Sequence, residues 1–187
     1  MNTDLTMITT VDATHSRTSR TSAATPIVFV VKDDVSVRES VELLIEGAGW
    51  EPETFASAQE FLARPRAVVP SCLVLDVALP DLNGLDLQKR VSIERPDMPI
   101  IFISGYGDVP LTVQAMKAGA IEFLTKPFND NVLLGAIRYA LERSRRALEH
   151  EARMRSLRDS YSLLTPRERE VMVLVASGLL NKQVGGE

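Results

Sequence analysis

Short runs of apolar, β-branched residues recur at regular intervals along much of the chain. The first is Ile27–Val31, and others fall at 72–75, 100–103 and 121–124, with a weaker one near 53–55. A continuous apolar run of this length is typical of a strand that is buried on both faces. Helical patterns lie between the runs, roughly at 57–63, 84–94 and 109–118, after a first one that carries Val37, Val41, Leu44 and Ile45 on one face and ends at Gly47 and Gly49.

Strands that alternate with helices predict βαβ units and a parallel sheet. Because such crossovers are right-handed, the helices should cover both faces of the sheet. Five strands and five helices fit residues 26 to about 142. We therefore expect an α/β fold with a five-stranded, parallel, doubly wound sheet. In such sheets the working site lies at the carboxyl ends of the strands, so the residues that follow each strand are the ones to inspect.

The chain after Pro127 shows no strand pattern, and residues 130–162 predict one long helix. The part from Arg143 to Arg158 is too polar for a core helix, so it is either a solvated linker or a weak coiled-coil seam. We favour the solvated linker because the positions that would form the seam are not consistently apolar.

A further helical unit follows this long helix. Thr165 suits an N-cap, Pro166 suits the first helical position, and Glu168 completes a capping box. This helix should end near Ser177, and another should begin near Asn181. The predicted segments are a tail at 1–25, a main domain at 26–142, a helical linker at 143–162 and the start of a helical domain at 163–187.

Composition narrows the class of protein. Residues 1–25 are rich in Thr and Ser and hold few large apolar groups, which predicts disorder. They lack the basic-then-apolar order of a secretory signal, and no apolar run approaches the ~20 residues of a membrane span. Cys72 is the single cysteine, which excludes a disulfide framework within the chain and fits a cytoplasmic protein; its apolar setting predicts a core position.

Charge is distributed unevenly along the chain. Residues 1–137 carry 11 Lys or Arg and 18 Asp or Glu, a balance of −7, whereas residues 138–187 carry 10 and 7, a balance of +3. An acidic front suits a cation-binding pocket, and a basic tail permits contact with nucleic acid without requiring it.

Residues able to handle phosphate follow the predicted strands. Lys32, Asp33 and Asp34 follow the first strand, Asp76 the third, Ser104 the fourth and Lys126 the fifth. An ionised aspartate in a cleft can act as a nucleophile, and a divalent cation and a fixed ammonium can neutralise the charge that builds on a transferring phosphoryl group. Because Mg²⁺ prefers oxygen ligands, Asp33, Asp76 and one backbone carbonyl are suitable for it, while Lys126 can hold a phosphate oxygen as a point charge.

These residues resemble the receiver domain of bacterial two-component response regulators, in the subgroup whose output is a LuxR-type helix-turn-helix. The resemblance rests on Asp76 followed by Pro80-Asp81-Leu82-Asn83-Gly84, on Ser104-Gly105-Tyr106-Gly107-Asp108, on Ala115-Met116-Lys117-Ala118-Gly119-Ala120 and on Lys126-Pro127-Phe128. It covers about residues 27–140 and implies a flavodoxin-like receiver sheet. A shorter stretch, 164–171, resembles the opening of the LuxR-type DNA-binding domain.

The resemblance also implies a role for each site residue. Asp76 would be the phosphoacceptor and Lys126 the lysine that contacts the phosphoryl group. Asp33, Asp76 and the backbone carbonyl of Ala78 would hold Mg²⁺. Ser104 and Phe123 would form a pair that switches between two arrangements, although Phe123 is as readily explained as a core residue.

The resemblance further implies partners. The chain would accept a phosphoryl group from a sensor histidine kinase, pair with a second copy on activation and control transcription, without acting as an enzyme on an outside substrate. The recognition helix of a LuxR-type domain enters the major groove of DNA and would lie beyond residue 187. We therefore expect the full-length protein, but not this chain, to bind DNA specifically, and we expect no membrane partner.

Lys32 departs from the pattern of the family. Receivers have two acids directly after the first strand, and the first of these positions is Lys32 here. A register that made Asp33 and Asp34 the pair is rejected, because it would bring Arg38 one residue too close. An ammonium near a divalent ion is repulsive, so Mg²⁺ binding and phosphorylation should be weakened, yet the ammonium could also pair with Asp33 or Asp76. The alternative function is thus a phosphorylation-independent dimerisation or protein-binding module.

Overall fold

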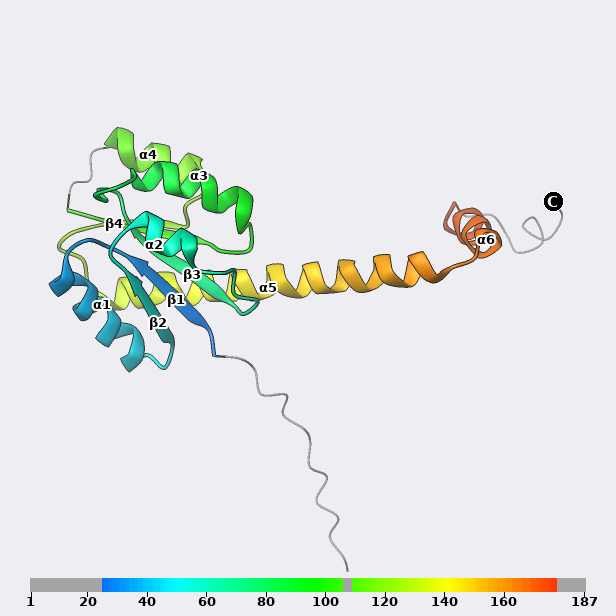
Figure 1. The fold of residues 1–187 in the computed structure, drawn as a ribbon, viewed down its shortest axis with the longest axis horizontal. Helices are drawn as coiled ribbons and strands as arrows, with labels where there is room; N and C mark the ends of the chain where they lie inside the picture. Colours follow the sequence, from blue (N-terminus) through cyan, green and yellow to red (C-terminus); the bar gives the residue numbers. More distant parts are fainter. Residues whose placement is uncertain (1–24, 106–108, 178–187) are drawn as a thin grey trace, which may run out of the picture.

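The structure, a computed structural model, describes residues 25–105 and 109–177 (Figure 1). The elements in chain order are β1 (Ile27–Val31), α1 (Val35–Gly47), β2 (Glu51–Phe55), α2 (Ala58–Ala63), β3 (Ser71–Asp76), α3 (Gly84–Glu94), β4 (Ile100–Ser104), α4 (Val109–Lys117), β5 (Glu122–Thr125), α5 (Asp130–Leu163) and α6 (Pro166–Ala176). The predicted alternation of strand and helix is confirmed. The predicted disordered tail and the helix expected near Asn181 lie outside the described residues, apart from residue 25.

The five strands form one parallel sheet in the order β2-β1-β3-β4-β5. Helices α2, α3 and α4 pack on one face of the sheet, and α1 and α5 pack on the other. The order reverses between β1 and β3, so the carboxyl ends of these two central strands lie side by side. The predicted doubly wound α/β fold is confirmed, and its switch point is the place where sheets of this kind bind ligands.

The side chains of alternate residues in the central strands pack into two separate hydrophobic cores, one on each face of the sheet. Phe29 and Leu73 join the core beneath α2 to α4, whereas Val28 and Cys72 join the core beneath α1 and α5. All of these side chains are fully buried, which explains why the strands read as continuous apolar runs. Cys72 is a core residue as predicted, and burial raises the pKa of its thiol.

The edge strand β2 explains the weakest part of the sequence pattern. It pairs only with β1 in the sheet, and none of its residues is fully buried. Its Glu53 carboxylate accepts two hydrogen bonds from the Arg64 guanidinium, at 2.6 and 2.7 Å. An edge strand needs fewer apolar residues, so its signal in the sequence is correspondingly faint.

Helix α5 is continuous for 34 residues and leaves the body of the domain part-way along (Figure 1). Its buried residues, Leu133, Ile137, Ala140, Leu141 and Ser144, all lie in its first half. The predicted long helix is confirmed. The domain boundaries drawn at residues 142 and 162 stay predictions, because the helix runs through the first of them without a break.

Helix α6 begins with the predicted capping box. The Thr165 hydroxyl accepts from the Glu168 N–H, and the Glu168 carboxylate accepts from the Thr165 N–H at 2.8 Å, with Pro166 in the first turn. In the part of the chain that the structure describes, no helix combines the length and apolar character needed to cross a bilayer.

Candidate functional site

Asp76 is the last residue of β3 and lies at the switch point of the sheet. It is only 6% exposed, which is rare for an aspartate without partners. Its Oδ1 accepts a hydrogen bond of 3.0 Å from the backbone N–H of Ala78, two residues on. The loop after β3 thus holds one carboxylate oxygen, Oδ1, and the other oxygen, Oδ2, contacts a second partner.

That partner is Lys32, the residue directly after β1. Strands β1 and β3 pair with Val31 opposite Leu75, so Lys32 comes next to Asp76. The Lys32 ammonium contacts Asp76 Oδ2 and also donates to Asp33 Oδ1 at 2.9 Å. Burial by itself would lower the pKa of the Lys32 ammonium, but its bonds to the two carboxylates outweigh burial and hold that pKa above its ordinary value. The same hydrogen bond from Lys32 holds the pKa of Asp33 below its ordinary value.

The backbone around Lys32 is held in place by neighbouring elements. The Lys32 N–H donates to Phe55 O of β2 at 3.1 Å. The Arg38 guanidinium of α1 donates to the carbonyl oxygens of Lys32 and Asp33, at 2.6 and 2.8 Å. Asp34 is the N-cap of α1, so the structure places Lys32 and Asp33, rather than Asp34, around Asp76.

The loop after Asp76 is shaped by Gly84 and Asp81. The Gly84 N–H donates to Val77 O at 2.8 Å, and a Cβ at Gly84 would lie 2.3 Å from the carbonyl oxygen of Asp76. A glycine is therefore required for this close approach of two backbone segments. Asp81 accepts from two N–H groups at the start of α2, those of Ala58 at 3.1 Å and Gln59 at 2.8 Å. Desolvation by itself would raise the pKa of Asp81, but these hydrogen bonds hold it below its ordinary value.

Ser104 and Lys126 lie on the same edge of the sheet. In the β3–β4 register Asp76 stands opposite Ile103, so Ser104 lies one residue further on; Ser104 is 4% exposed. The Lys126 N–H donates to Ser104 O at 2.9 Å, and the Lys126–Pro127 peptide bond is cis. The structure thus brings these two residues together at the ends of β4 and β5.

Phe123 is a buried residue in the middle of β5. Its ring stacks on Phe102 of β4 with a centroid separation of 5.8 Å. This is the core position that the sequence allowed for it, and its role as a moving switch stays a prediction. The predicted loop residues 106–108 lie outside the described residues.

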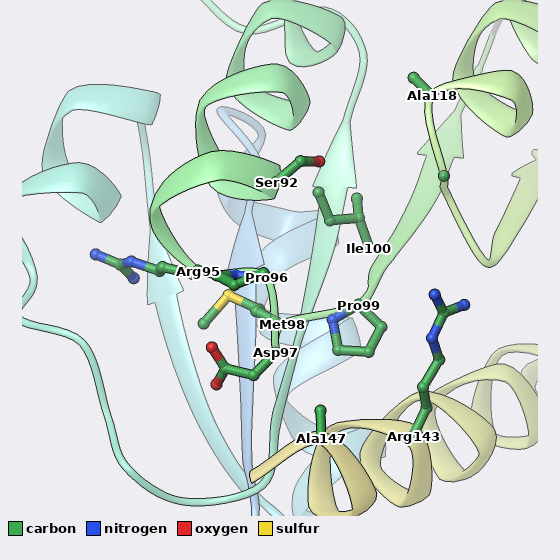
Figure 2. A pocket seen from close by; sticks show the side chains of 11 residues that line it. Ser92, Arg95, Pro96, Asp97, Met98, Pro99, Ile100, Ala118, Arg143 and Ala147 are labelled. Atoms are coloured by element: carbon green, nitrogen blue, oxygen red, sulfur yellow. The ribbon is translucent and has the colours of Figure 1, made fainter. Parts of the chain in front are cut away.

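A cavity at the opposite, amino edge of the sheet is separate from these residues. Figure 2 shows it at the amino end of β4, where it is lined by Pro99 and Ile100 together with Arg143 of α5, and its volume is about 210 Å³. No predicted site residue lines it. The carboxyl end of the sheet is therefore the candidate site on chemical grounds, because the charged and phosphate-handling groups gather there.

Comparison with known proteins identifies this arrangement. A family model described as the response regulator receiver domain matches residues 28–138. The chain belongs to the response regulator receiver family. The predicted membership in this family is thereby confirmed, and so is the receiver fold.

Several known proteins are similar to this chain over most of its length. Nodulation protein W of Bradyrhizobium diazoefficiens is 50% identical over 161 residues, which cover 86% of this chain and 71% of that protein. Transcriptional regulatory protein FixJ of the same organism is 38% identical over 160 residues, 86% and 78% of the two chains. The solved structure of response regulator StyR is 45% identical with a TM-score of 0.79, and the match covers 87% and 82% of the chains.

The residues present do not fit a divalent metal ion as the pocket stands. Asp33 and Asp76, two of the three predicted Mg²⁺ ligands, flank one ammonium, which contacts an oxygen of each. Among the residues that the structure describes, no group of three or more His, Cys, Asp or Glu side chains could hold a metal. The roles of Asp33, Asp76 and Ala78 as metal ligands therefore stay predictions.

Two residues that position the receiver site were not singled out for this role by the sequence. Arg38 served only to choose the register, yet its guanidinium donates to the carbonyl oxygens of Lys32 and Asp33. Asp81 belonged to a motif, but its contact with α2 spans more than 20 residues of sequence. No local spacing signals a contact of that range, so only the folded chain could show it.

Proposed function

We propose that this chain is a two-component response regulator that accepts a phosphoryl group on Asp76 from a histidine kinase. The observation that carries the proposal is the placement of a buried Asp76 carboxylate at the switch point, with one ammonium on it and Ser104 and Lys126 at the adjoining strand ends. In the transfer, an Asp76 oxygen would form a bond to phosphorus while the bond from phosphorus to the histidine nitrogen breaks, and that nitrogen keeps the electron pair.

The phosphoryl group would then shift a population of states. The Lys126 ammonium would attract its oxygens, and the Ser104 hydroxyl would donate to one of them. Such contacts favour one arrangement of the ends of β4 and β5 over another, and Phe123, which stacks on Phe102 in the core, lies two residues before the end of β5. The favoured arrangement would pair with a second copy of the chain.

The output of the switch would be transcription. Relatives named transcriptional regulatory proteins support this, as does the capped helix α6, which follows α5 as the opening of a LuxR-type helix-turn-helix would. We place the full-length protein in the cytoplasm, on DNA as a dimer, and assign it no turnover of an outside substrate.

The test is a measurement of intact mass after incubation with a small acyl phosphate and Mg²⁺, beside an Asp76→Asn control. One phosphoryl adduct on the original chain, absent from the control, is the expected result. An adduct that persists in Asp76→Asn would refute the assignment of Asp76. No adduct on the original chain, but one on Lys32→Asp, would mean that Lys32 has disabled the transfer.

A phosphorylation-independent module is the second candidate. Its motivation is the contact between Lys32 and Asp76, which already supplies the carboxylate with a positive partner. The comparisons do not favour it, because the relatives are named as response regulators. It predicts no phosphoryl adduct on the original chain and none on Lys32→Asp.

A further inference from the structure

Lys32 is the feature of the pocket that the family pattern does not explain. Its ammonium touches Asp76 Oδ2 and Asp33 Oδ1, so it lies between the two carboxylates predicted to hold a metal ion. The side chain of Lys32 is 14% exposed, and that of Asp76 is 7% exposed. The contact with Asp76 is therefore screened far less than a surface ion pair, whereas the Asp33 side chain is 51% exposed.

The position of the ammonium is set by the backbone rather than by the side chain alone. Both peptide groups of Lys32 are held, its N–H by Phe55 O and its carbonyl oxygen by Arg38. Asp76 and Asp33 are held as well, because each accepts from a backbone N–H: Asp76 Oδ1 from Ala78 and Asp33 Oδ1 from Asp34, at 3.0 and 2.9 Å. The three charged groups are therefore preorganised around one point, as a metal and its ligands would be.

The charges around that point show what it can accept. Two carboxylates this close repel each other unless a cation lies between them. The Lys32 ammonium is that cation. A divalent metal ion a few ångströms from this ammonium would be repelled by it, so the two cations cannot share the site without cost. A divalent ion could reach the two oxygens only by displacing the ammonium from both of them.

We propose that Lys32 is a built-in replacement for the divalent cation of the receiver pocket, so that this receiver excludes Mg²⁺ from the site between Asp33 and Asp76. The inference rests on the proposed function in treating the pocket as the phosphoryl site. Its test does not use phosphorylation, so the two can fail separately.

The test is a pair of titrations of the full chain. Binding of Mn²⁺ is measured through the electron paramagnetic resonance signal of the free ion, and binding of Mg²⁺ is measured by calorimetry. Lys32→Met removes the charge at nearly constant length, and Lys32→Asp supplies the missing acid. Lys89→Met is the matched control, because Lys89 makes an exposed ion pair with Asp86 of the same helix at 2.8 Å and contacts neither Asp33 nor Asp76 in the ion pairs described. Circular dichroism establishes that each variant is folded.

We expect the original chain and Lys89→Met to bind either ion more weakly than Lys32→Met by a factor on the order of ten or more, and Lys32→Asp to bind most tightly. Equal affinity in the original chain and Lys32→Met would overturn the proposal.

A second measurement uses only the original chain and so does not depend on the folding of a variant. The backbone amides of Asp34 and Ala78 donate to the two carboxylates, so their nuclear magnetic resonance signals report on the site. We expect Mn²⁺ to leave these two signals unbroadened. Selective broadening of both at low Mn²⁺ concentration would place the ion in the pocket and overturn the proposal.

Discussion

At the scale of single residues, the site depends on atoms that approach more closely than most side chains would permit. Gly84 lies against the carbonyl oxygen of Asp76, and the Gly84 N–H is bonded to Val77 O. The glycine thereby determines how the loop leaves the end of β3. The motif spacing from Asp76 to Gly84 was visible in the sequence, but its steric reason lies in this contact.

Gly84→Ala should destabilise the chain by about 1–3 kcal/mol, because the new Cβ would meet backbone atoms that cannot move independently. Chemical denaturation followed by circular dichroism measures this. Gly135→Ala is the matched control: nothing lies within 4 Å of its Cβ position in α5, so it should stabilise by up to about 1 kcal/mol. Equal effects of the two substitutions would contradict the steric explanation.

At the scale of elements, the loop that carries Asp76 is tied to a helix from another part of the chain. Asp81 accepts from two backbone N–H groups in the first turn of α2, and Ser57 caps the same helix by accepting from Glu60 N–H. Two caps from different segments satisfy the donors at one helix end. Helix α2 and the loop after β3 are therefore coupled.

Asp81→Ala should cost about 1 kcal/mol of stability at neutral pH through loss of this cap. Because the folded pKa of Asp81 lies below the ordinary value of 3.8, its contribution is present above that value and is lost as the pH falls through the lower, folded pKa. The difference between the two proteins should thus shrink as the pH falls below the ordinary value of 3.8. Asp86→Ala, at a nearby exposed position, is the control and should lack this cap effect. A difference that is unchanged at low pH would mean that the carboxylate is not the cap.

At the scale of the whole molecule, α5 is attached to the receiver at its last buried residue, Ser144, and again beyond it. The Ser144 hydroxyl accepts from the N–H of Ser71, at the start of β3, at 3.0 Å. Further along, Arg66 bridges Asp97 at 2.7 Å and Glu151 of α5 at 3.0 Å. Asp97 is 5% exposed, so Arg66 supplies a buried carboxylate with its partner while it also holds the helix.

Arg66→Met should destabilise the receiver by about 1–3 kcal/mol, because it leaves the Asp97 carboxylate buried without this partner. It should also speed hydrogen exchange in α5 around Glu151. Glu151→Gln is the comparison: it breaks only the exposed half of the bridge, so it should speed exchange in the helix with little change in overall stability. If the two variants lost the same stability, Asp97 would not be the source of the cost.

The sequence by itself determined the order of the elements, the parallel sheet and the gathering of Asp76, Ser104 and Lys126 at one edge. These follow from the periodicity of apolar residues and from the handedness of crossovers, both of which are local or general. It also indicated that the Lys32 ammonium could pair with Asp33 or Asp76, whereas the adjacency of β1 and β3 came from the structure.

Only the tertiary structure decided which contacts those neighbours make. Three contacts depend on side-chain positions in three dimensions. Lys32 contacts the carboxylates of Asp33 and Asp76, Asp81 caps α2, and Arg66 forms an ion pair with Glu151. Each contact joins residues whose separation in sequence obeys no period, or depends on a rotamer chosen among several. Hydrophobic patterning specifies which face of an element is buried, whereas the charges that meet at its end are decided by the packing of the whole chain.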